Sequence, residues 1–376
     1  MNKMILILPF DAKKGAEGRK EDAINTLKIA HKNIGFDVVT ITATPSYCEE
    51  LLCYLNNFEI KLMKLLSFTN NRFTQYLWFL FILFIIKKTK LRNEIKLVFS
   101  YAMTGNSNVL AYLINKFFNI EYVINEHRTI FQRDAIRLPR SQKVSLDNAK
   151  VVLSLTPSHT KYIEKYTKTK VFDIPLVLQD KYLTSKVISD DDFSIFKIAA
   201  WTNWRDIKRL DLLVEAFDAF SADKNNVNLL IAGPIPDELI EKNIIEYISR
   251  HSLQNKVTLL GQQNRDKIFQ LANQCHLCIL PSDHETFGIP ASEALCLGKP
   301  VITTRCGGPE NFIKDYFNGF TISCDSRTEL VDKMNYIYDN YQEFDHYAIA
   351  EQARSVFSVT NLSLKLKAIY NNLVGR

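Results

Sequence analysis

The sequence predicts an α/β protein built from doubly wound parallel sheets, and three observations predict it. Short apolar runs of strand length alternate with amphipathic helical stretches along the chain. The alternation stops at a polar segment and restarts near residue 196. The chain has 376 residues, enough for two domains at roughly 100–200 residues each. We therefore expect two domains, each with its own parallel sheet.

The first half of the chain contains six apolar runs of strand length. They lie at Ile5–Leu8, Val38–Thr42, Leu97–Ser100, Tyr122–Asn125, Val151–Leu155 and Val171–Ile174. Parallel strands need a crossover between them, and a helical pattern through Ala23, Leu27 and Ala30 supplies the first one. The first run is short, apolar and ended by Pro9, which suits a buried parallel strand.

The same pattern continues in the second half. We expect strands at Phe196–Ala200, Asn228–Ala232, Val257–Leu260, Leu277–Leu280 and from Val301 onward. We expect the intervening helices at Leu210–Phe220, Asp237–His251, Arg265–Gln274 and from Pro290 to Gly298. The polar segment Gln179–Asp192 separates the two series, so the predicted domains are 1–180 and 193–358. Asp190 and Asp192 in it form a D-x-D pattern, for which a solvated charge run is the favoured interpretation over a metal site.

Composition excludes several classes of protein. Apolar residues make up 47% and charged residues 23%, which is typical of a globular chain and not of a disordered one. Seven cysteines follow no disulfide spacing, and an odd number of thiols fits a reducing cytoplasm. Cys275 and Cys278 form a C-x-x-C, but no second ligand pair follows and a buried strand runs through them, so we predict no metal. The apolar N-terminus lacks a signal-peptide cleavage pattern.

The charge is divided unevenly between the two halves. Residues 1–175 carry 26 Lys and Arg against 15 Asp and Glu, a net +11, and the remainder carries 21 against 26, a net −5. A basic half indicates an anionic partner such as a phosphorylated substrate or a lipid surface, with a merely solvated basic surface as the alternative. No basic-aromatic recognition motif accompanies the charge, so nucleic acid is not expected.

A strongly apolar segment stands apart at Phe73–Ile86, followed by the basic run Lys87–Arg92. Its unbroken apolar part, Tyr76–Ile86, is about half of the ~20 residues that a spanning helix needs. The segment is therefore a buried core helix or an interfacial helix on an anionic bilayer, and the sequence leaves both open.

The stretch Leu280–Thr303 is the most informative part of the chain. A strand ends at Pro281, and a loop then carries Asp283, His284 and Glu285. Gly288 allows a close backbone approach, and Pro290 suits the first turn of a helix. Loops at the carboxyl ends of parallel strands that lead into a helix are where open α/β sheets bind anions and nucleotides. Glu285 and Glu293 on this loop and helix are therefore candidate ligands for sugar and ribose hydroxyls.

Here a family resemblance becomes specific. The segment Glu285-Thr-Phe-Gly-Ile-Pro-Ala-Ser-Glu293 resembles the E-x-F-G-x-x-x-x-E signature of retaining family 4 glycosyltransferases. The segment Lys208–Phe217 resembles that family's Lys-Gly-x-x-x-Leu-x-x-Ala-Phe. The pair Gly307-Gly308 looks like its glycine-pair loop, and Glu126-His127 follows a strand as the family's acceptor-side histidine does. These motifs occur in the family's order over most of the chain.

The resemblance implies the GT-B fold, in which two Rossmann-like domains face each other across a cleft. A C-terminal helix, here Val359–Leu373 in a segment 359–376, would return to the first domain. It implies that no metal or other cofactor is needed and that the donor is a nucleotide diphosphate sugar. The basic first half and the segment Tyr76–Arg92 indicate a saccharide or lipid-linked saccharide acceptor, as in surface polysaccharide assembly. They also indicate that the protein is cytoplasmic and peripheral on the inner face of the cytoplasmic membrane.

The resemblance also assigns roles to single residues. Glu293 would bind the ribose hydroxyls, and Glu285 would contact the transferred sugar. The backbone at Phe287 and Gly288 would lie near sugar and diphosphate, and Lys208 would neutralise the diphosphate.

In the first domain, His127 would contact sugar or acceptor, and the loop of Gly15 and Gly18 would approach the phosphates. The family's arginine position is Asn203 here, and we expect the nearby Arg205 to replace it. The alternatives are a nucleotide-sugar epimerase of similar architecture or a non-catalytic nucleotide-sugar-binding protein.

Overall fold

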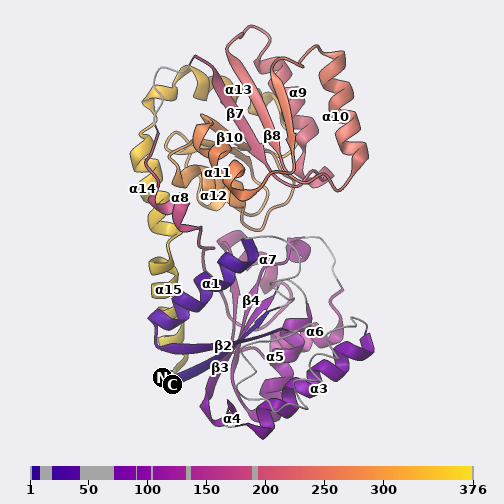
Figure 1. Ribbon diagram of the computed structural model, residues 1–376, viewed down its shortest axis with the longest axis vertical. Coiled ribbons are helices and arrows are strands. Elements are labelled where there is room, and N and C mark those ends of the chain that lie inside the picture. The colour runs from indigo at the N-terminus through magenta and orange to yellow at the C-terminus, as the bar shows by residue number, and fades with distance from the viewer. Residues whose placement is uncertain are drawn as a thin grey trace. The chain divides into compact units, whose positions relative to one another are not determined.

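The computed structural model describes residues 2–8, 19–42, 72–89, 91–102, 105–132, 137–188 and 194–374. Gly15 and Gly18, and the D-x-D pattern at 190–192, lie outside these ranges. The chain divides into two compact units, one formed by Met1–Val177 with Val359–Arg376 and the other by Leu178–Ser358 (Figure 1). Each unit contains one six-stranded sheet in which every strand pair is parallel. The predicted fold class is therefore confirmed.

The sheet of the first unit has the strand order β2-β1-β3-β4-β5-β6. Its strands are β1 (Asn2–Leu8), β2 (Phe36–Thr42), β3 (Ile95–Ala102), β4 (Tyr122–Glu126), β5 (Val151–Ser154) and β6 (Val171–Asp173). Its helices include α1 (Arg19–Asn33), α3 (Arg72–Lys88), α4 (Leu91–Glu94), α5 (Gly105–Phe118), α6 (Arg140–Asp147), α7 (Pro157–Glu164) and the 3-10 helix η2 (Thr129–Gln132). The chain crosses from one strand to the next through these helices.

Successive residues of a strand point to opposite faces of a sheet, and β1 shows both faces buried. Ile5 and Ile7 belong to one core cluster, together with residues of α3 and α5. Met4 and Leu6 belong to the other cluster, on the opposite face. This two-sided burial explains why β1 is a continuous apolar run without alternation.

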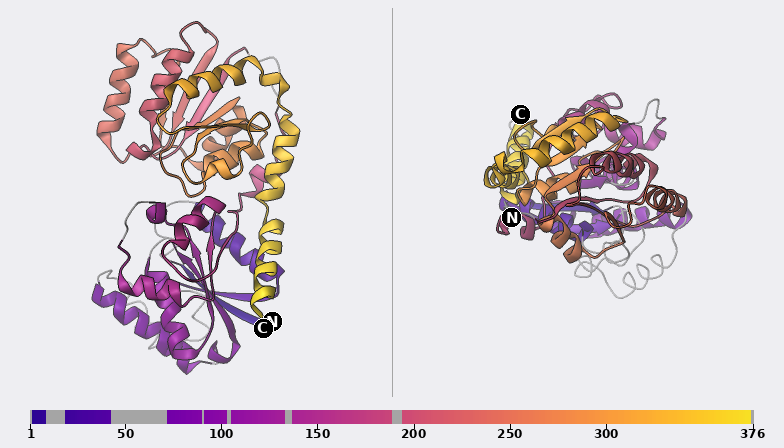
Figure 2. Two further views of the ribbon diagram at one scale, coloured as in Figure 1. Left: turned by 180° about the vertical axis from the view of Figure 1, so that it is seen from behind. Right: turned by 90° about the horizontal axis from the view of Figure 1, so that it is seen from above.

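The C-terminal helix α15 (Val359–Val374) completes the second of these clusters. Leu366 and Ile369 lie in it, and α15 contacts α1 beside it (Figure 2). His31 of α1 joins the two helices, since its Nε2 lies 3.0 Å from the hydroxyl of Tyr370 and its Nδ1 2.7 Å from the carbonyl of Leu27. The expectation that the last helix returns to the first part of the fold is confirmed.

The second unit has the strand order β12-β11-β10-β7-β8-β9. Its strands are β7 (Phe196–Trp201), β8 (Val227–Ala232), β9 (Val257–Gly261), β10 (Leu277–Leu280), β11 (Val301–Thr304) and β12 (Gly319–Ile322). Its helices are α8 (Asp180–Thr184), α9 (Leu210–Phe220), α10 (Glu238–Arg250), α11 (Arg265–Gln274), α12 (Ile289–Cys296), α13 (Arg327–Asp339), α14 (His346–Val356) and the 3-10 helices η3 (Asp206–Lys208), η4 (Pro309–Asn311) and η5 (Tyr341–Glu343). The bounds of α9, α11 and β10 coincide with the predicted ones.

Residues 179–188 pack on the second unit, although their polar composition suggests a free linker. They contain α8, and Lys181 forms an ion pair with Asp266 at 2.9 Å. The buried ammonium of Lys299 donates to the carbonyl of Ile188 at 2.8 Å. The polar side chains of this segment therefore serve as partners for unit 2 rather than only for water.

Candidate functional site

The candidate site of the second unit lies where its strand order reverses. The chain runs from β7 outward through β8 and β9, and then returns to the other side of β7 with β10. Ligands of open α/β sheets bind at the carboxyl ends of the strands at such a switch point. Two loops leave this point, 202–208 after β7 and 281–288 after β10. They carry Lys208 and Glu285, and the helix that follows the second loop carries Glu293.

Lys208 and Glu285 form an ion pair between the two loops. Lys208 Nζ donates to Glu285 Oε1, and each side chain is 13% exposed. Ser282 Oγ donates to the same oxygen at 3.3 Å, and the Glu285 amide donates to the carbonyl of Cys306 at 3.0 Å. The structure thus brings together two residues that the sequence assigns to diphosphate and sugar. The positive charge of Lys208 and the negative charge of Glu285 therefore compensate each other beside the switch point of the sheet.

Glu293 is held against the end of β7. It is 1% exposed, and its Oε2 accepts a hydrogen bond of 2.7 Å from the indole Nε1 of Trp201, which is equally buried. Among the described residues, Oε1 of Glu293 has no hydrogen-bond partner. A carboxylate that has one oxygen hydrogen-bonded and the other without a partner can accept a hydrogen bond from a ribose hydroxyl. Trp201 is a site residue that sequence reasoning missed, and its place at the end of β7 was the available signal.

Two glycines let the loops of this site approach each other closely. Gly288 adopts φ +85, and a Cβ there would come within 2.8 Å of Pro309. A Cβ on Gly308 would lie 2.7 Å from the amide nitrogen of Phe287 and 2.8 Å from the carbonyl oxygen of Glu285. The carboxylate of Glu310 accepts hydrogen bonds from the amides of Gly307 and Gly308, at 2.7 and 2.9 Å. Side chains at these two positions would therefore push the two loops apart.

The side chain of Phe287 belongs to the core rather than to the ligand side. It is 3% exposed, and its ring contacts Phe312 and Phe357 at centroid distances of 5.4 and 5.6 Å. Of Phe287, therefore, only the backbone can contact a ligand bound at this loop. The helix α12 begins directly after it, with Gly288 as its N-cap residue and Pro290 in its first turn, as the sequence predicts.

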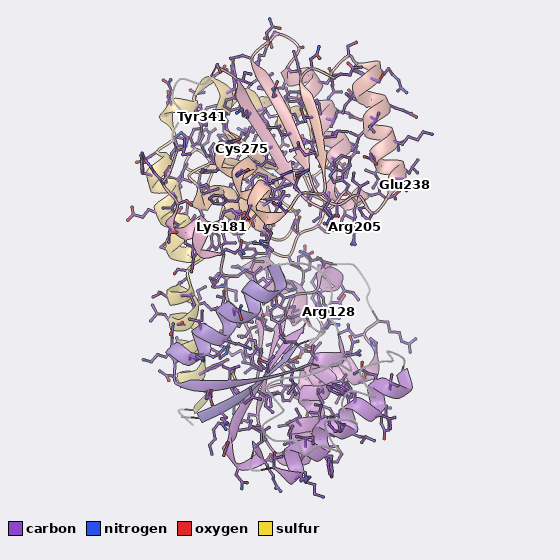
Figure 3. The ribbon with its side chains drawn as sticks, viewed as in Figure 1. Arg128, Lys181, Arg205, Glu238, Cys275 and Tyr341 are labelled. Carbon is purple, nitrogen blue, oxygen red and sulfur yellow. The ribbon has the colours of Figure 1, made fainter. Side chains whose placement is uncertain are left out.

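Asn203 and Arg205 lie together on the loop after β7. Both side chains are exposed, and the Arg205 amide donates to the carbonyl of Asn203 at 3.0 Å. The guanidinium of Arg205 has no hydrogen-bond or ion-pair partner within the part of the chain that the structure describes. It lies among the loops that follow the strand ends (Figure 3). Arg205 can therefore take up an anion without first breaking an ion pair.

Arg209 is a second residue that sequence reasoning missed. It has φ +48 and ψ 46, a left-handed conformation that costs a non-glycine residue about 1 kcal/mol or more. Its Nε lies 3.2 Å from Asp211, its Nη1 3.5 Å from Asp283, and Nη1 also contacts Asp325. Hydrogen bonding to Asp211 is the main reason why the pKa of Arg209 is raised. The signal in the sequence was an arginine where the resembling motif has glycine.

The first unit places His127 directly after β4. Its ring packs against that of Tyr101 in a tilted arrangement with a centroid distance of 4.2 Å, and its Nε2 is buried without a hydrogen-bond partner among the described residues. Burial, and next the charge of the neighbouring His159, lower the pKa of His127 to about 3. The imidazole is therefore neutral near pH 7 and suits a hydrogen bond to a hydroxyl group.

The strand that precedes His127 is held by a buried ion pair. Glu126 is fully buried, and Arg128 donates to both of its oxygens at 2.7 Å. Such bidentate pairs are geometrically specific, so this pair fixes the backbone of His127, which lies between its two residues.

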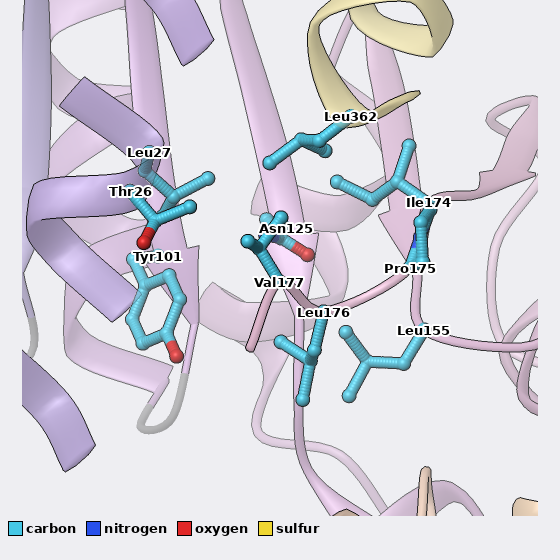
Figure 4. Close-up of a pocket in the computed structure, with 10 residues that line it drawn as sticks. All are labelled: Thr26, Leu27, Tyr101, Asn125, Leu155, Ile174, Pro175, Leu176, Val177 and Leu362. Atoms are coloured by element: carbon cyan, nitrogen blue, oxygen red, sulfur yellow. The ribbon is translucent and has the colours of Figure 1, made fainter. Parts of the chain in front are cut away.

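A small cavity of about 20 Å³ lies nearby, lined by Tyr101 and Asn125 among other residues (Figure 4). It has room for about one water molecule.

Cys278 of the C-x-x-C pair lies in β10, and Cys275 precedes that strand. Cys275 and Cys278 are buried, and burial raises the pKa of the Cys275 thiol to about 11. Among the described residues, no group of three or more His, Cys, Asp or Glu side chains is arranged to hold a metal ion. Within the same ranges, no helix has the length and apolar character needed to cross a bilayer.

Comparisons with known proteins show which proteins this chain resembles. Residues 182–355 match the family described as glycosyl transferases group 1. Among curated relatives, an uncharacterized glycosyltransferase of Methanocaldococcus jannaschii is 27% identical over 133 residues, which are 35% of this chain and 35% of the relative. The match thus spans about a third of that relative's length.

Solved structures resemble the chain over its whole length. Sucrose-phosphate synthase of Thermosynechococcus elongatus has a TM-score of 0.73 and 16% identity and covers 100% of both chains. HepE of Anabaena, solved in complex with UDP-glucose, has a TM-score of 0.70 and 16% identity, over 99% of this chain and 100% of that one. These likenesses establish the GT-B fold class that the sequence motifs imply.

Proposed function

We propose that this protein is a retaining glycosyltransferase, which moves a sugar from a nucleotide diphosphate sugar to a hydroxyl group of an acceptor. The match of residues 182–355 to group 1 glycosyl transferases supports the transferase class. The observation that carries the proposal is the site at the switch between β7 and β10. There Lys208 and Glu285 form an ion pair between two loops, and Glu293 lies on the helix that follows the second loop.

Each of these residues has a part in the proposed reaction. The diphosphate gains negative charge as its bond to the sugar breaks, so a cation beside it stabilises the transition state more than the ground state. Lys208 supplies one such cation and exposed Arg205 a second. Glu285, paired with Lys208, would accept hydrogen bonds from sugar hydroxyls. Glu293 would accept from the ribose through the oxygen that Trp201 leaves available.

The donor in this proposal is a nucleotide diphosphate sugar. HepE, a structural neighbour, was solved with UDP-glucose, which makes uridine nucleotides the first probes. In the first unit, neutral His127 would hydrogen-bond the sugar or acceptor. We place the acceptor among saccharides or lipid-linked saccharides used in surface polysaccharide assembly.

A lipid-linked acceptor is supported by the surface of α3. Most of its apolar residues are buried in the core, including Trp78, but Tyr76, Leu80 and Phe84 are 61%, 45% and 51% exposed. They follow one another at four-residue spacing and so form one stripe. The exposed Lys87 and the adjacent Lys88 end the helix, which contains no acidic residue. We infer that this stripe meets an anionic bilayer, at the inner face of the cytoplasmic membrane.

A vesicle co-sedimentation experiment tests the membrane contact. We expect binding to vesicles rich in phosphatidylglycerol, loss of binding as salt rises, and much weaker binding of Leu80→Glu. Leu364→Glu is the matched control, because Leu364 is a 62% exposed leucine on another helix of the same unit. Equal binding to neutral vesicles, or no difference between the two variants, would refute the contact.

The donor site is tested by a thermal-shift screen of nucleotide sugars, followed by product analysis with the donor that binds. A ligand at 100 times its Kd stabilises the native state by about 2.7 kcal/mol. Glu293→Gln keeps an acceptor oxygen for Trp201, so we expect its melting temperature without ligand to stay near wild type. Its nucleotide affinity should fall about 10- to 100-fold, the value of a hydrogen bond to a charged group. Glu246→Gln, at an exposed position of α10, is the control.

The outcomes separate this function from its alternatives. Transfer to an acceptor with retained anomeric configuration supports the proposal, whereas inverted products refute the retaining mechanism. Conversion of the donor sugar without an acceptor indicates an epimerase. Tight donor binding with no chemistry, over a broad set of saccharide acceptors, indicates a binding protein. Unchanged nucleotide affinity in Glu293→Gln removes the ribose assignment.

A further inference from the structure

We propose that Arg209 is a positioning residue. It determines which carboxylate pairs with each of the adjacent cations Lys208 and Arg209. Arg209 holds Asp283, and this leaves Lys208 paired with Glu285. The inference rests on the proposed function, because it concerns the loop to which that function assigns the donor sugar. It adds a residue that the resembling motif does not contain.

The backbone at residue 209 does not call for an arginine. The residue links the end of η3 to the start of α9 with φ +48, in the left-handed region that glycine adopts without strain. The motif that this segment resembles has glycine at this position. A strained residue persists where its surroundings hold it, so the side chain must account for the arginine.

The side chain of Arg209 contacts carboxylates from three separate elements. Asp211 belongs to the first turn of α9, Asp283 to the loop after β10, and Asp325 to the segment between β12 and α13. Arg209 and Asp283 are 22% and 32% exposed, so the contact between these two is less screened than that of a free surface pair. One guanidinium thus ties the loop after β10 to two neighbouring parts of the unit.

The loop after β10 is docked on the 207–209 backbone itself. The Asp283 amide donates to the carbonyl of Ile207 at 2.9 Å. Asp283 and Glu285 are two residues apart on this loop, and Lys208 and Arg209 are adjacent on the other. Without the guanidinium, the Asp283 carboxylate would compete with Glu285 for the Lys208 ammonium, since opposite charges on neighbouring loops attract each other. Lys208 would then be drawn toward Asp283, and Glu285 would lose its fixed partner.

The test compares Arg209→Gly with wild type in three measurements. Glycine relieves the backbone strain, so the melting temperature should stay the same or rise. Hydrogen exchange in the peptide covering 281–288 should accelerate, because the loop loses one of its ties. With the donor found in the screen, kcat should fall about 10- to 100-fold, as displaced catalytic groups commonly cause.

A second substitution isolates the role of Asp283. In Arg209→Gly/Asp283→Asn the loop that carries Glu285 no longer has the Asp283 carboxylate, so kcat should recover to within about threefold of wild type, a coupling typical of contacting residues. Asp325→Asn removes a different partner of Arg209 and is the control, with kcat within the same range. If Arg209 had only a structural role, the second substitution would lower kcat further and would not rescue it.

Three results overturn the inference. Arg209→Gly with wild-type kcat and wild-type exchange in 281–288 shows that the loop does not depend on the guanidinium. A double variant as impaired as the single one shows that Asp283 is not the competing group. A lower melting temperature of Arg209→Gly shows a structural role. If wild type transfers no sugar, the proposed function fails, while exchange and melting still decide whether Arg209 positions the loop.

Discussion

His31 makes the attachment of the C-terminal helix sensitive to acid. The side chain is fully buried between α1 and α15, and burial lowers its pKa from 6.5 to about 4. The unfolded chain therefore takes up a proton below pH 6.5, while the folded protein does not until about pH 4. The stability due to neutral His31 is complete above pH 6.5 and is lost as pH falls toward 4.

The size of the effect follows from the difference in pKa. One pKa unit corresponds to about 1.4 kcal/mol, so the full loss at low pH is about 3 kcal/mol for this residue. Between pH 7.5 and pH 5 the loss is about 2 kcal/mol, a substantial part of the stability of an ordinary domain. His159 is also buried, and burial lowers its pKa to about 4, so it adds to the loss in the same unit and with the same sign.

The assay measures unfolding of the two helices directly. Urea titrations at pH 7.5 and pH 5, each ended by a short deuterium pulse, report by mass spectrometry when α1 and α15 open. We expect wild type to lose about 2 kcal/mol more than His31→Gln between the two pH values, because glutamine does not titrate. His284→Gln, which replaces an exposed histidine of the other unit, is the matched control. The same pH dependence in wild type and His31→Gln would refute the reasoning.

Two further predictions concern the proposed donor site. Arg205→Ala should lower kcat by about 10²–10³-fold, as removal of one electrostatic stabiliser does, whereas Asn203→Ala should have much less effect. Steady-state kinetics with the identified donor measures both, and near-normal turnover in Arg205→Ala would exclude the replacement of the missing arginine. Glu285→Gln should lower turnover while nucleotide diphosphate affinity, measured by calorimetry, stays within about threefold of wild type, since the glutamate is assigned to the sugar. A large loss of affinity would instead assign Glu285 to the nucleotide, directly or through Lys208.

Local patterns carried most of the secondary structure. The helices Leu210–Phe220 and Arg265–Gln274 have the predicted bounds, because their apolar residues recur with the helical period and their ends are marked in the adjacent sequence. The helix after Gly288 begins where glycine and Pro290 place it. Strands buried on both faces were visible as short apolar runs. Each of these features depends only on residues within a few positions of one another.

The pattern of α3 shows where such local information ends. Its sequence is apolar nearly all round, so its periodicity did not separate a core helix from an interfacial one. Packing against α5 decided that Trp78 is buried and that Leu80 is exposed. The direction of the buried face is a property of the partner helix and sheet, and it is not written in the segment itself.

The sequence by itself determined the fold class, the order of the elements and the candidate carboxylates Glu285 and Glu293. Only the tertiary structure decided their partners, since Lys208 is 77 residues from Glu285, and Trp201 is 92 residues from Glu293. It likewise brought Tyr370 to His31 across 339 residues. Such contacts follow from the order in which strands assemble, because parallel strands at a switch point bring the loops at their carboxyl ends together whatever their separation in the chain. A motif can specify a side chain, but its charge is balanced by a neighbour that only the folded sheet supplies.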